Sequence, residues 1–213
     1  MEMTMKTSTK FWDKIADRYS KRPISDEAAY QRKLQISRQY FEPEMDVLEF
    51  GCGTGGTAIL HAPFVKHIRA TDISPRMIEI AKERQSKANA GNVTFEVASI
   101  ETINVPDASL NVVMGMSILH LLDDERAAIA KVYRMLKPGG VFISSTTCLG
   151  DHLKIFKYIE PIGRFLGLMP SVNVFTQAHL MRELRGAGFQ IEHEWRPGKI
   201  AATFVVARKP ALA

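Results

Sequence analysis

Short apolar runs alternate with amphipathic segments through the middle of the chain, from residue 45 to about residue 147. The apolar runs predict strands, and they span residues 45–50, 67–71, 93–97, 110–117 and 141–147. The segments between them repeat apolar residues at helical spacing, which predicts helices at residues 57–62, 75–89 and 123–136. This alternation predicts an α/β fold, with a parallel sheet covered by helices on both faces.

Helical patterns also precede the first predicted strand. Apolar residues recur at helical spacing on each side of the break at Arg22-Pro23, so two helices are expected there. The residues that make up these patterns are Phe11, Trp12, Ile15, Ala16 and Tyr19, followed by Tyr30, Leu34 and Phe41.

The last part of the chain departs from the alternation. Residues 149–174 hold apolar side chains interrupted by proline and glycine, which indicates an insertion. Thr176 then predicts the start of a helix and Gly188 its end. Two strands follow at residues 190–195 and 201–207. A Pro-Gly turn joins them, so they are expected to pair in antiparallel fashion.

Size and composition indicate one ordinary globular domain. The chain has 213 residues, of which 46% are hydrophobic and 24% charged. The longest nearly apolar run, residues 110–122, is shorter than the about 20 residues that a transmembrane helix needs, and the N-terminus lacks the apolar core of a signal peptide. We therefore expect a cytoplasmic protein without a membrane span. Cys52 and Cys148 do not indicate a disulfide or a metal site.

The net charge of +5 does not by itself indicate a nucleic-acid partner. The basic excess lies in the first 40 residues, where acidic side chains such as Asp13 and Asp17 are interspersed with the basic ones. Mixed charges on predicted helices favour a solvated face over a phosphate-binding surface. No stable nucleic-acid complex is expected, and the oligomeric state stays open.

The most informative motif is a glycine-rich turn directly after the first strand. Gly51-Cys52-Gly53-Thr54-Gly55-Gly56 follows residues 45–50, and Asp72 follows the second strand, 21 residues after Gly51. Glycines allow a sharp turn and the close approach of a ligand, and a carboxylate at the same sheet edge can bind both hydroxyls of a ribose. The alternatives are a simple tight turn and a helix-capping role for Asp72.

The glycine spacing alone also fits dinucleotide-binding proteins. Glu49, the helical sequence of about 45 residues before the strand, and the segment Leu136-Lys137-Pro138-Gly139-Gly140 favour another cofactor. Together these features resemble the class I S-adenosylmethionine-dependent methyltransferases, over roughly residues 11–209. The resemblance implies a Rossmann-like, doubly wound seven-stranded sheet with one reversed strand.

The same resemblance implies a set of residues around S-adenosyl-L-methionine. They are Trp12, Tyr19, Glu49, Gly51, Cys52, Gly53, Asp72, Ile73, Met77, Ser99, Ile100 and Ser117. Ser99 stands where relatives usually carry an acidic residue that binds adenine. Met77 could equally be a core residue of an amphipathic helix, and Trp12 and Tyr19 could pack the first helix onto the sheet.

Methyl transfer from a sulfonium is an in-line displacement, so positioning and exclusion of water matter most. A base is needed only if the acceptor must lose a proton. His120, after the fourth strand, is the candidate catalytic residue, and packing beside the cofactor is its alternative role. His152 and His179 are weaker candidates, since surface or capping roles suit them better.

The resemblance also implies a division of the chain. Residues 1–44 would form a helical cap, 45–148 the cofactor-binding core, 149–174 a substrate-side insertion, and 175–213 a C-terminal helix with an antiparallel strand pair. The expected activity is methyl transfer to a small, largely apolar acceptor, with S-adenosyl-L-homocysteine as product. The alternatives are a methyltransferase for RNA or another macromolecule, a non-catalytic S-adenosylmethionine-binding protein, and an NAD-dependent oxidoreductase.

Overall fold

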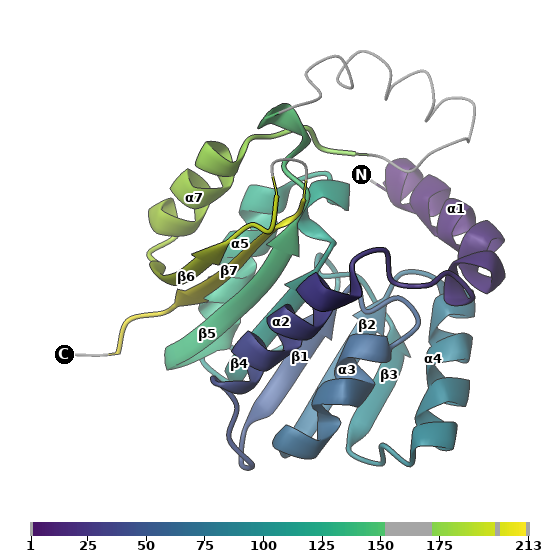
Figure 1. Ribbon diagram of the computed structural model, residues 1–213. Helices are drawn as coiled ribbons and strands as arrows, with labels where there is room; N and C mark the ends of the chain where they lie inside the picture. Colours follow the sequence, from purple (N-terminus) through teal and green to yellow (C-terminus); the bar gives the residue numbers. More distant parts are fainter. Residues whose placement is uncertain (1, 152–171, 199–200, 212–213) are drawn as a thin grey trace.

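A single seven-stranded sheet forms the centre of the protein. The computed structural model describes residues 2–151, 172–198 and 201–211 (Figure 1). The strands lie side by side in the order β3-β2-β1-β4-β5-β7-β6. Their bounds are β1 Asp46–Phe50, β2 His67–Asp72, β3 Val93–Val97, β4 Leu110–Met116, β5 Leu136–Thr146, β6 Gln190–Trp195 and β7 Thr203–Arg208.

The strand directions agree with the sequence prediction. Strands β1 to β5 pair in parallel fashion, and β7 runs antiparallel to both of its neighbours, β5 and β6. The chain order reverses between β1 and β4, because β2 and β3 lie on one side of β1 and β4 to β7 on the other. Open parallel sheets bind ligands beyond the carboxyl ends of their strands at such a point.

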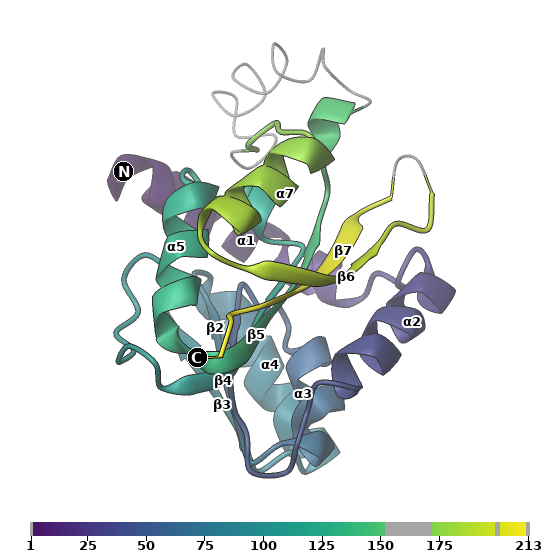
Figure 2. The same cartoon turned by 90° about the vertical axis from the view of Figure 1, so that its left-hand side faces the viewer.

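Helices cover both faces of the sheet, as Figures 1 and 2 show. One face carries α2 (Glu27–Arg38), α3 (Gly56–His61) and α4 (Pro75–Ala88), and the other carries α5 (Glu125–Met135) and α7 (Gln177–Gly186). Side chains on the two faces form two separate apolar clusters, which include Ile68 with Ile78 on one face and Phe142 with Leu184 on the other. The result is a three-layer α/β/α arrangement, as predicted.

Short side chains begin the helices where the sequence predicts a start. Ser74 Oγ accepts a hydrogen bond from Met77 N–H at 3.1 Å, and Thr176 Oγ1 accepts one from His179 N–H at 3.1 Å. Each bond satisfies a helix N–H that has no partner within the helix. The described residues also include three short 3-10 helices: η1 Ala62–Phe64, η2 Leu119–Leu121 and η3 Leu149–Asp151.

Helix α1 (Glu2–Ser20) packs against α4 beside the carboxyl edge of the sheet. Asp13 Oδ1 accepts hydrogen bonds from Ser74 Oγ at 2.5 Å and from Arg76 N–H at 3.2 Å. At its other end, the carbonyl oxygen of Ser20 accepts a hydrogen bond from Arg84 at 2.6 Å. The first helix is therefore bonded to the element that follows Asp72.

Strand β5 begins earlier than the sequence pattern predicts. The pattern predicts a helix to residue 136 and a strand at 141–147, but α5 ends at Met135 and β5 runs from Leu136 to Thr146. Leu136 pairs with Leu110, and the register shifts between Leu110 and Val112. Gly139 adopts a φ of 81°, which carries the chain through the Pro-Gly segment without leaving the sheet.

The predicted insertion at residues 149–174 lies largely outside the described residues, which resume at Val172. His152, the weaker base candidate of that segment, lies outside them as well. Within residues 2–151, 172–198 and 201–211, no helix is long and apolar enough to cross a membrane. In the same ranges, no group of three His, Cys, Asp or Glu side chains is arranged to hold a metal ion.

Candidate active site

The glycine turn after β1 has a backbone conformation that residues with a Cβ rarely adopt. Gly51, Gly53 and Gly55 have φ angles of 65°, 53° and 77°. The turn is held by two backbone hydrogen bonds, from Cys52 N–H to the Thr71 oxygen at 2.9 Å and from Gly55 N–H to the Cys52 oxygen at 3.0 Å. The loop is therefore rigidly attached to the end of β2.

Two of these glycines differ in what surrounds them. A Cβ on Gly51 would lie 2.6 Å from Ile118 Cγ1, so the protein itself fills the space beside Gly51. A Cβ on Gly53 would meet only Tyr19 Cε1, at 3.9 Å. The backbone at Gly53 is therefore open to a ligand, with the Tyr19 ring from α1 at its border.

Asp72, at the end of β2, binds the glycine loop directly. Its Oδ2 accepts a hydrogen bond from Gly53 N–H at 2.9 Å, and its Oδ1 accepts one from Ser74 N–H at 2.9 Å. Each oxygen keeps a second lone pair, which is the capacity needed for two sugar hydroxyls. The bond to Ser74 also supports the start of α4, so the ligand-binding and capping interpretations of Asp72 are compatible.

Glu49 lies on β1, beneath the loop, and is 1% exposed. Burial and the nearby Asp72 carboxylate raise its pKa to about 8. Its Oε2 is buried and has no hydrogen-bond partner among the described residues. The carboxyl receives a backbone hydrogen bond from Ala58, but a buried oxygen without a partner is costly. A cationic group arriving beside Oε2 would stabilise the ionised form of Glu49.

These residues fit S-adenosylmethionine. Its ribose presents two hydroxyls that match the oxygens of Asp72, and its amino group and sulfonium are cations that suit the unpaired Oε2 of Glu49. The open backbone at Gly53 supplies a surface for close approach. Burial also raises the pKa of Asp72 and of the Cys52 thiol, so Cys52 is not a reactive thiolate.

The residues expected around adenine lie at the ends of β2 and β3. Ser99 is 7% exposed, and its Oγ lies 3.1 Å from Thr102 Oγ1 and accepts a hydrogen bond from Thr102 N–H at 3.2 Å. The Ile100 side chain belongs to the core and is 2% exposed. Ile73 directly follows Asp72 and is half-buried. Roles for Ser99, Ile100 and Ile73 in binding adenine stay predictions.

Met77 and Trp12 pack where α1 meets α4. Met77 is 2% exposed and belongs to a small cluster with Ala16 and Ile80, against which Trp12 packs. These contacts match the core and packing alternatives for both residues. Tyr19 is different, because it is 44% exposed and lies beside Gly53, with its ring edge-on to Trp12 at 6.1 Å.

His120 and Ser117 follow the end of β4. Burial lowers the pKa of His120 to about 4, and its Nδ1 is buried without a hydrogen-bond partner in the described part of the chain. The imidazole is therefore neutral at neutral pH and can accept a proton, although a pKa of about 4 makes it a weaker base than an ordinary histidine. Ser117 is exposed with a φ of 60°, and its N–H donates to the Ser145 oxygen on β5 at 2.7 Å.

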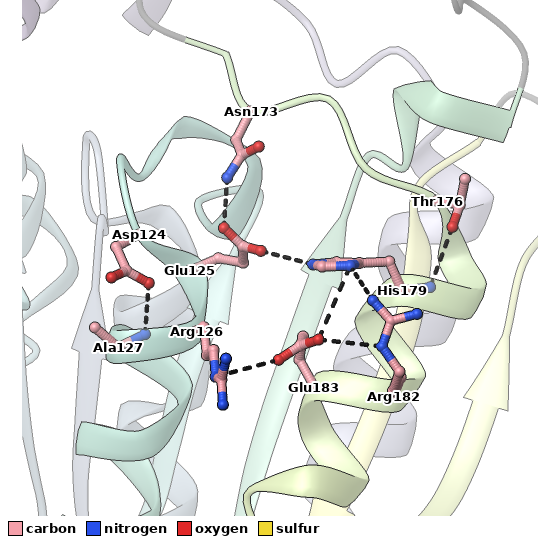
Figure 3. A network of polar contacts seen from close by, with 9 residues as sticks. All are labelled: Asp124, Glu125, Arg126, Ala127, Asn173, Thr176, His179, Arg182 and Glu183. Atoms are coloured by element: carbon pink, nitrogen blue, oxygen red, sulfur yellow. Dashed lines mark hydrogen bonds and ion pairs between the residues drawn. The ribbon is translucent and has the colours of Figure 1, made fainter.

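The His120 segment is bonded to α5 and α7 through Asn173 and Glu125, which sequence reasoning did not identify. The His120 oxygen accepts a hydrogen bond from Asn173 N–H at 2.7 Å, and the Asn173 side chain donates to Glu125. Glu125 is buried at the start of α5 and lies 2.7 Å from His179 Nε2 on α7 (Figure 3). No sequence signal indicates this network, because an acidic residue at a helix start is common and the burial of Glu125 is a property of the folded protein.

His179 is a structural member of this network. Arg182 Nη2 lies 2.6 Å from His179 Nδ1 and can only donate. Nδ1 is therefore the acceptor, and Nε2–H donates a hydrogen bond to Glu125 Oε1. His179 N–H also donates to Thr176 Oγ1, so the residue that caps α7 is Thr176. The His179 side chain takes part in the network with Glu125 and Arg182 and caps no helix end in the described part of the chain.

Comparison with known proteins agrees with this fold. Residues 47–140, which contain the glycine turn and Asp72, match the family described as a methyltransferase domain. A putative S-adenosylmethionine-dependent methyltransferase from Listeria monocytogenes has a similar structure, with a TM-score of 0.72 and 23% identity over 85% of this chain and 97% of that one. That likeness supports the Rossmann-like methyltransferase fold.

Curated relatives extend the match to sequence. The malonyl-[acyl-carrier protein] O-methyltransferase of Serratia marcescens is 25% identical over 92% of this chain and 86% of its own length. A demethylmenaquinone methyltransferase of Leptospira interrogans is 35% identical over 49% of this chain, and the match spans 43% of its length. The chain belongs to the class I S-adenosylmethionine-dependent methyltransferases.

Proposed function

We propose that this methyltransferase binds S-adenosylmethionine along the carboxyl ends of β2 and β1 and transfers its methyl group to a small, largely apolar acceptor. The observation that carries the proposal is the joint placement of Asp72 and Glu49 around one glycine loop. Asp72 bonds the loop at Gly53, and Glu49 lies buried beneath it with an unpaired oxygen. A sugar and a cation are the groups that such a pair would bind.

The sheet order gives the cofactor a direction. Sugar hydroxyls at Asp72 place the base toward β3 and the methionine portion toward β1, since β1 lies between β2 and β4. The cofactor supplies an electrophilic methyl group on a sulfonium. The protein's part is to bind, orient and exclude water, because in-line displacement depends on alignment of the reacting atoms. Tyr19, beside Gly53, is placed to cover the sulfonium side, where an aromatic face favours a cation.

In this proposal, each part of the chain has the role that the sequence suggests. Residues 1–44 cap the cofactor, 45–148 bind it, and 175–213 complete the sheet, within one domain of 213 residues. The segment 149–174 would form the acceptor side. His120, after β4, is the group placed to take a proton from an acceptor that must lose one.

The acceptor class is suggested by the Serratia relative, whose name specifies an O-methylation of a malonyl group on a carrier protein. A carboxylate needs no base, whereas a phenol or an amine requires loss of a proton. A panel of small carboxylates, phenols and amines, tested with methyl-labelled S-adenosylmethionine, would distinguish these classes.

Thermal unfolding with four cofactors tests the proposal. S-adenosylmethionine and S-adenosylhomocysteine should raise the melting temperature, and NAD and NADP should not, because only a ligand that binds the native state stabilises it. Stabilisation by NAD alone would contradict the proposal. Binding of S-adenosylmethionine without label transfer to any acceptor in a broad panel would instead indicate a binding protein.

A further inference from the structure

Lys33 lies in the middle of α2 and reaches across the sheet to β5. Its Nζ donates a hydrogen bond to Ser145 Oγ at 2.9 Å, between residues 112 positions apart in the chain. Ser145 is 1% exposed and precedes the last residue of β5. The lysine ammonium is thus held at the carboxyl edge of the sheet, on the side where the cofactor is proposed to bind.

Helix α2 also contacts the glycine loop region. The Tyr30 hydroxyl lies 3.2 Å from Thr57 Oγ1, at the start of the helix that follows the loop. Tyr30 and Lys33 are three residues apart and therefore lie on the same face of α2. That face spans the distance from the glycine loop, after β1, to the end of β5.

Lys33 has no anionic partner among the residues that the structure describes. Its polar contact with the described residues is to the neutral Ser145 hydroxyl, and none of the ion pairs between these residues includes it. Asp26 is the carboxylate that acts on it electrostatically, but its Oδ1 caps α2 by accepting from Ala29 N–H. Burial lowers the pKa of Lys33. A half-buried cation with only a neutral partner is costly unless an anion joins it.

The position of Lys33 along the sheet indicates that this anion belongs to the methyl acceptor. A cofactor bound at Asp72 and the glycine loop occupies the ends of β2 and β1, so its methyl group faces β4 and β5. Ser117 N–H, at the end of β4, bonds the Ser145 oxygen, so Lys33 lies one strand beyond the proposed cofactor. A lysine ammonium has three N–H donors, and Ser145 uses one of them.

We propose that Lys33 binds a carboxylate of the methyl acceptor, with Ser145 as the residue that positions its ammonium. The inference rests on the proposed function and specifies its substrate class: a small, largely apolar molecule carrying one carboxylate. A single ammonium balances a single negative charge, whereas a phosphate dianion is usually bound by several donors or by an arginine fork.

Calorimetric titration with charged and uncharged probes tests this inference. The protein is first saturated with S-adenosylhomocysteine and then titrated with carboxylates from butanoate to decanoate and with the matching amides. We expect the best carboxylate to bind at least about tenfold more tightly than its amide. Lys33→Met should weaken binding of the carboxylate by about 10- to 100-fold, the size expected for loss of a charged hydrogen bond. It should change the affinity for the amide by less than twofold.

Matched variants separate a binding role from a structural one. Lys33→Arg should keep the preference for the carboxylate, and Ser145→Ala should weaken the carboxylate less than Lys33→Met does. Lys131→Met is the control, because Lys131 bonds the backbone oxygens of Glu101 and Ile103, away from this edge. It should leave both probes unaffected.

The outcomes distinguish the two proposals. If S-adenosylhomocysteine does not bind the wild-type protein, the proposed function fails. If it binds but no carboxylate is preferred over its amide, or if Lys33→Met keeps the preference, the function stands and the role of Lys33 is overturned.

Discussion

The backbone N–H of Gly53 donates a 2.9 Å hydrogen bond to Oδ2 of Asp72, across the ends of two neighbouring parallel strands. This bond couples the shape of the glycine loop to the side chain proposed to bind the sugar. One carboxylate therefore orders the backbone that faces the methionine portion while keeping lone pairs for the ribose. Loss of Asp72 should disturb both halves of the site together.

The first prediction concerns that carboxylate. Asp72→Ala should weaken the binding of S-adenosylhomocysteine by at least about 100-fold, as measured by calorimetry, because two hydrogen bonds to a charged group are lost. Asp46→Ala is the matched control, because Asp46 is a carboxylate at the opposite end of β1, 3.8 Å from Lys66. Equal affinities in the Asp72→Ala and Asp46→Ala variants would rule out the ribose role.

Two glycines of the loop should respond differently to the same substitution. Gly51→Ala forces a Cβ to within 2.6 Å of Ile118, so it should lower the free energy of unfolding by about 2–4 kcal/mol. Gly53→Ala has space for its Cβ and incurs only the φ penalty of about 1–2 kcal/mol.

The loss of cofactor affinity should follow the reverse order, with Gly53→Ala affected more than Gly51→Ala. The methyl group of Gly53→Ala points to the open side of the loop, so the variant should lose cofactor affinity even at temperatures where it is fully folded. Urea unfolding and S-adenosylhomocysteine titration of each variant measure both quantities. If Gly53→Ala binds as tightly as the wild type, the ligand does not approach the loop at Gly53.

The raised pKa of Glu49 predicts that the free energy of unfolding falls as the pH rises. The folded protein keeps the Glu49 proton up to about pH 8, whereas the unfolded chain releases it near pH 4.5. The unfolded state therefore loses this proton first as the pH rises, and the free energy of unfolding should fall between these values, by up to about 1.4 kcal/mol per pH unit. Glu49→Gln should remove this contribution, as urea unfolding at several pH values would show; an unchanged slope would contradict the assignment.

The same residue predicts that cofactor binding releases a proton at pH 7. A cation beside Glu49 favours the ionised carboxylate, so the proton must leave when the ligand binds. Calorimetry of S-adenosylhomocysteine binding in two buffers with different ionisation enthalpies counts the protons released. The wild type should release close to one, and Glu49→Gln should release none. Equal proton counts for the two proteins would mean that Glu49 does not meet the amino group.

His120 predicts a separation of binding from catalysis. His120→Ala should change the S-adenosylhomocysteine affinity by less than twofold and slow transfer to a proton-bearing acceptor by at least about 100-fold, the usual contribution of a general base. Because its pKa is about 4, His120 stays neutral from pH 6 to 8 and should add no pH dependence there. His67→Ala, at the opposite end of β2, is the control; unchanged turnover in His120→Ala would assign it to packing.

Features that depend on local backbone chemistry could be predicted from the sequence. The glycine turn, the Ser74-Pro75 helix start and the reversed strand β7 all follow from residues close together in the chain. The start of β5 differs from the predicted strand at residues 141–147, because the apolar pattern begins only at Val141, and bonds to β4 and Lys209 extend the strand back to Leu136.

Contacts between distant residues could not be predicted from periodicity. Asp13 meets Ser74 after 61 residues, Lys33 meets Ser145 after 112, and Asn173 binds the His120 oxygen. Asp13, Lys33 and Asn173 each resemble a surface residue in the sequence. Their roles depend on how the helices pack over the sheet, which the pattern of apolar positions does not determine.

The most direct test is a crystal structure of the protein with S-adenosylhomocysteine. The account predicts both ribose hydroxyls within about 2.6–3.2 Å of the Asp72 carboxylate and the amino group beside Glu49, with the sulfur directed toward β4. A nucleoside bound elsewhere, or an Asp72 side chain turned away from the sugar, would contradict it.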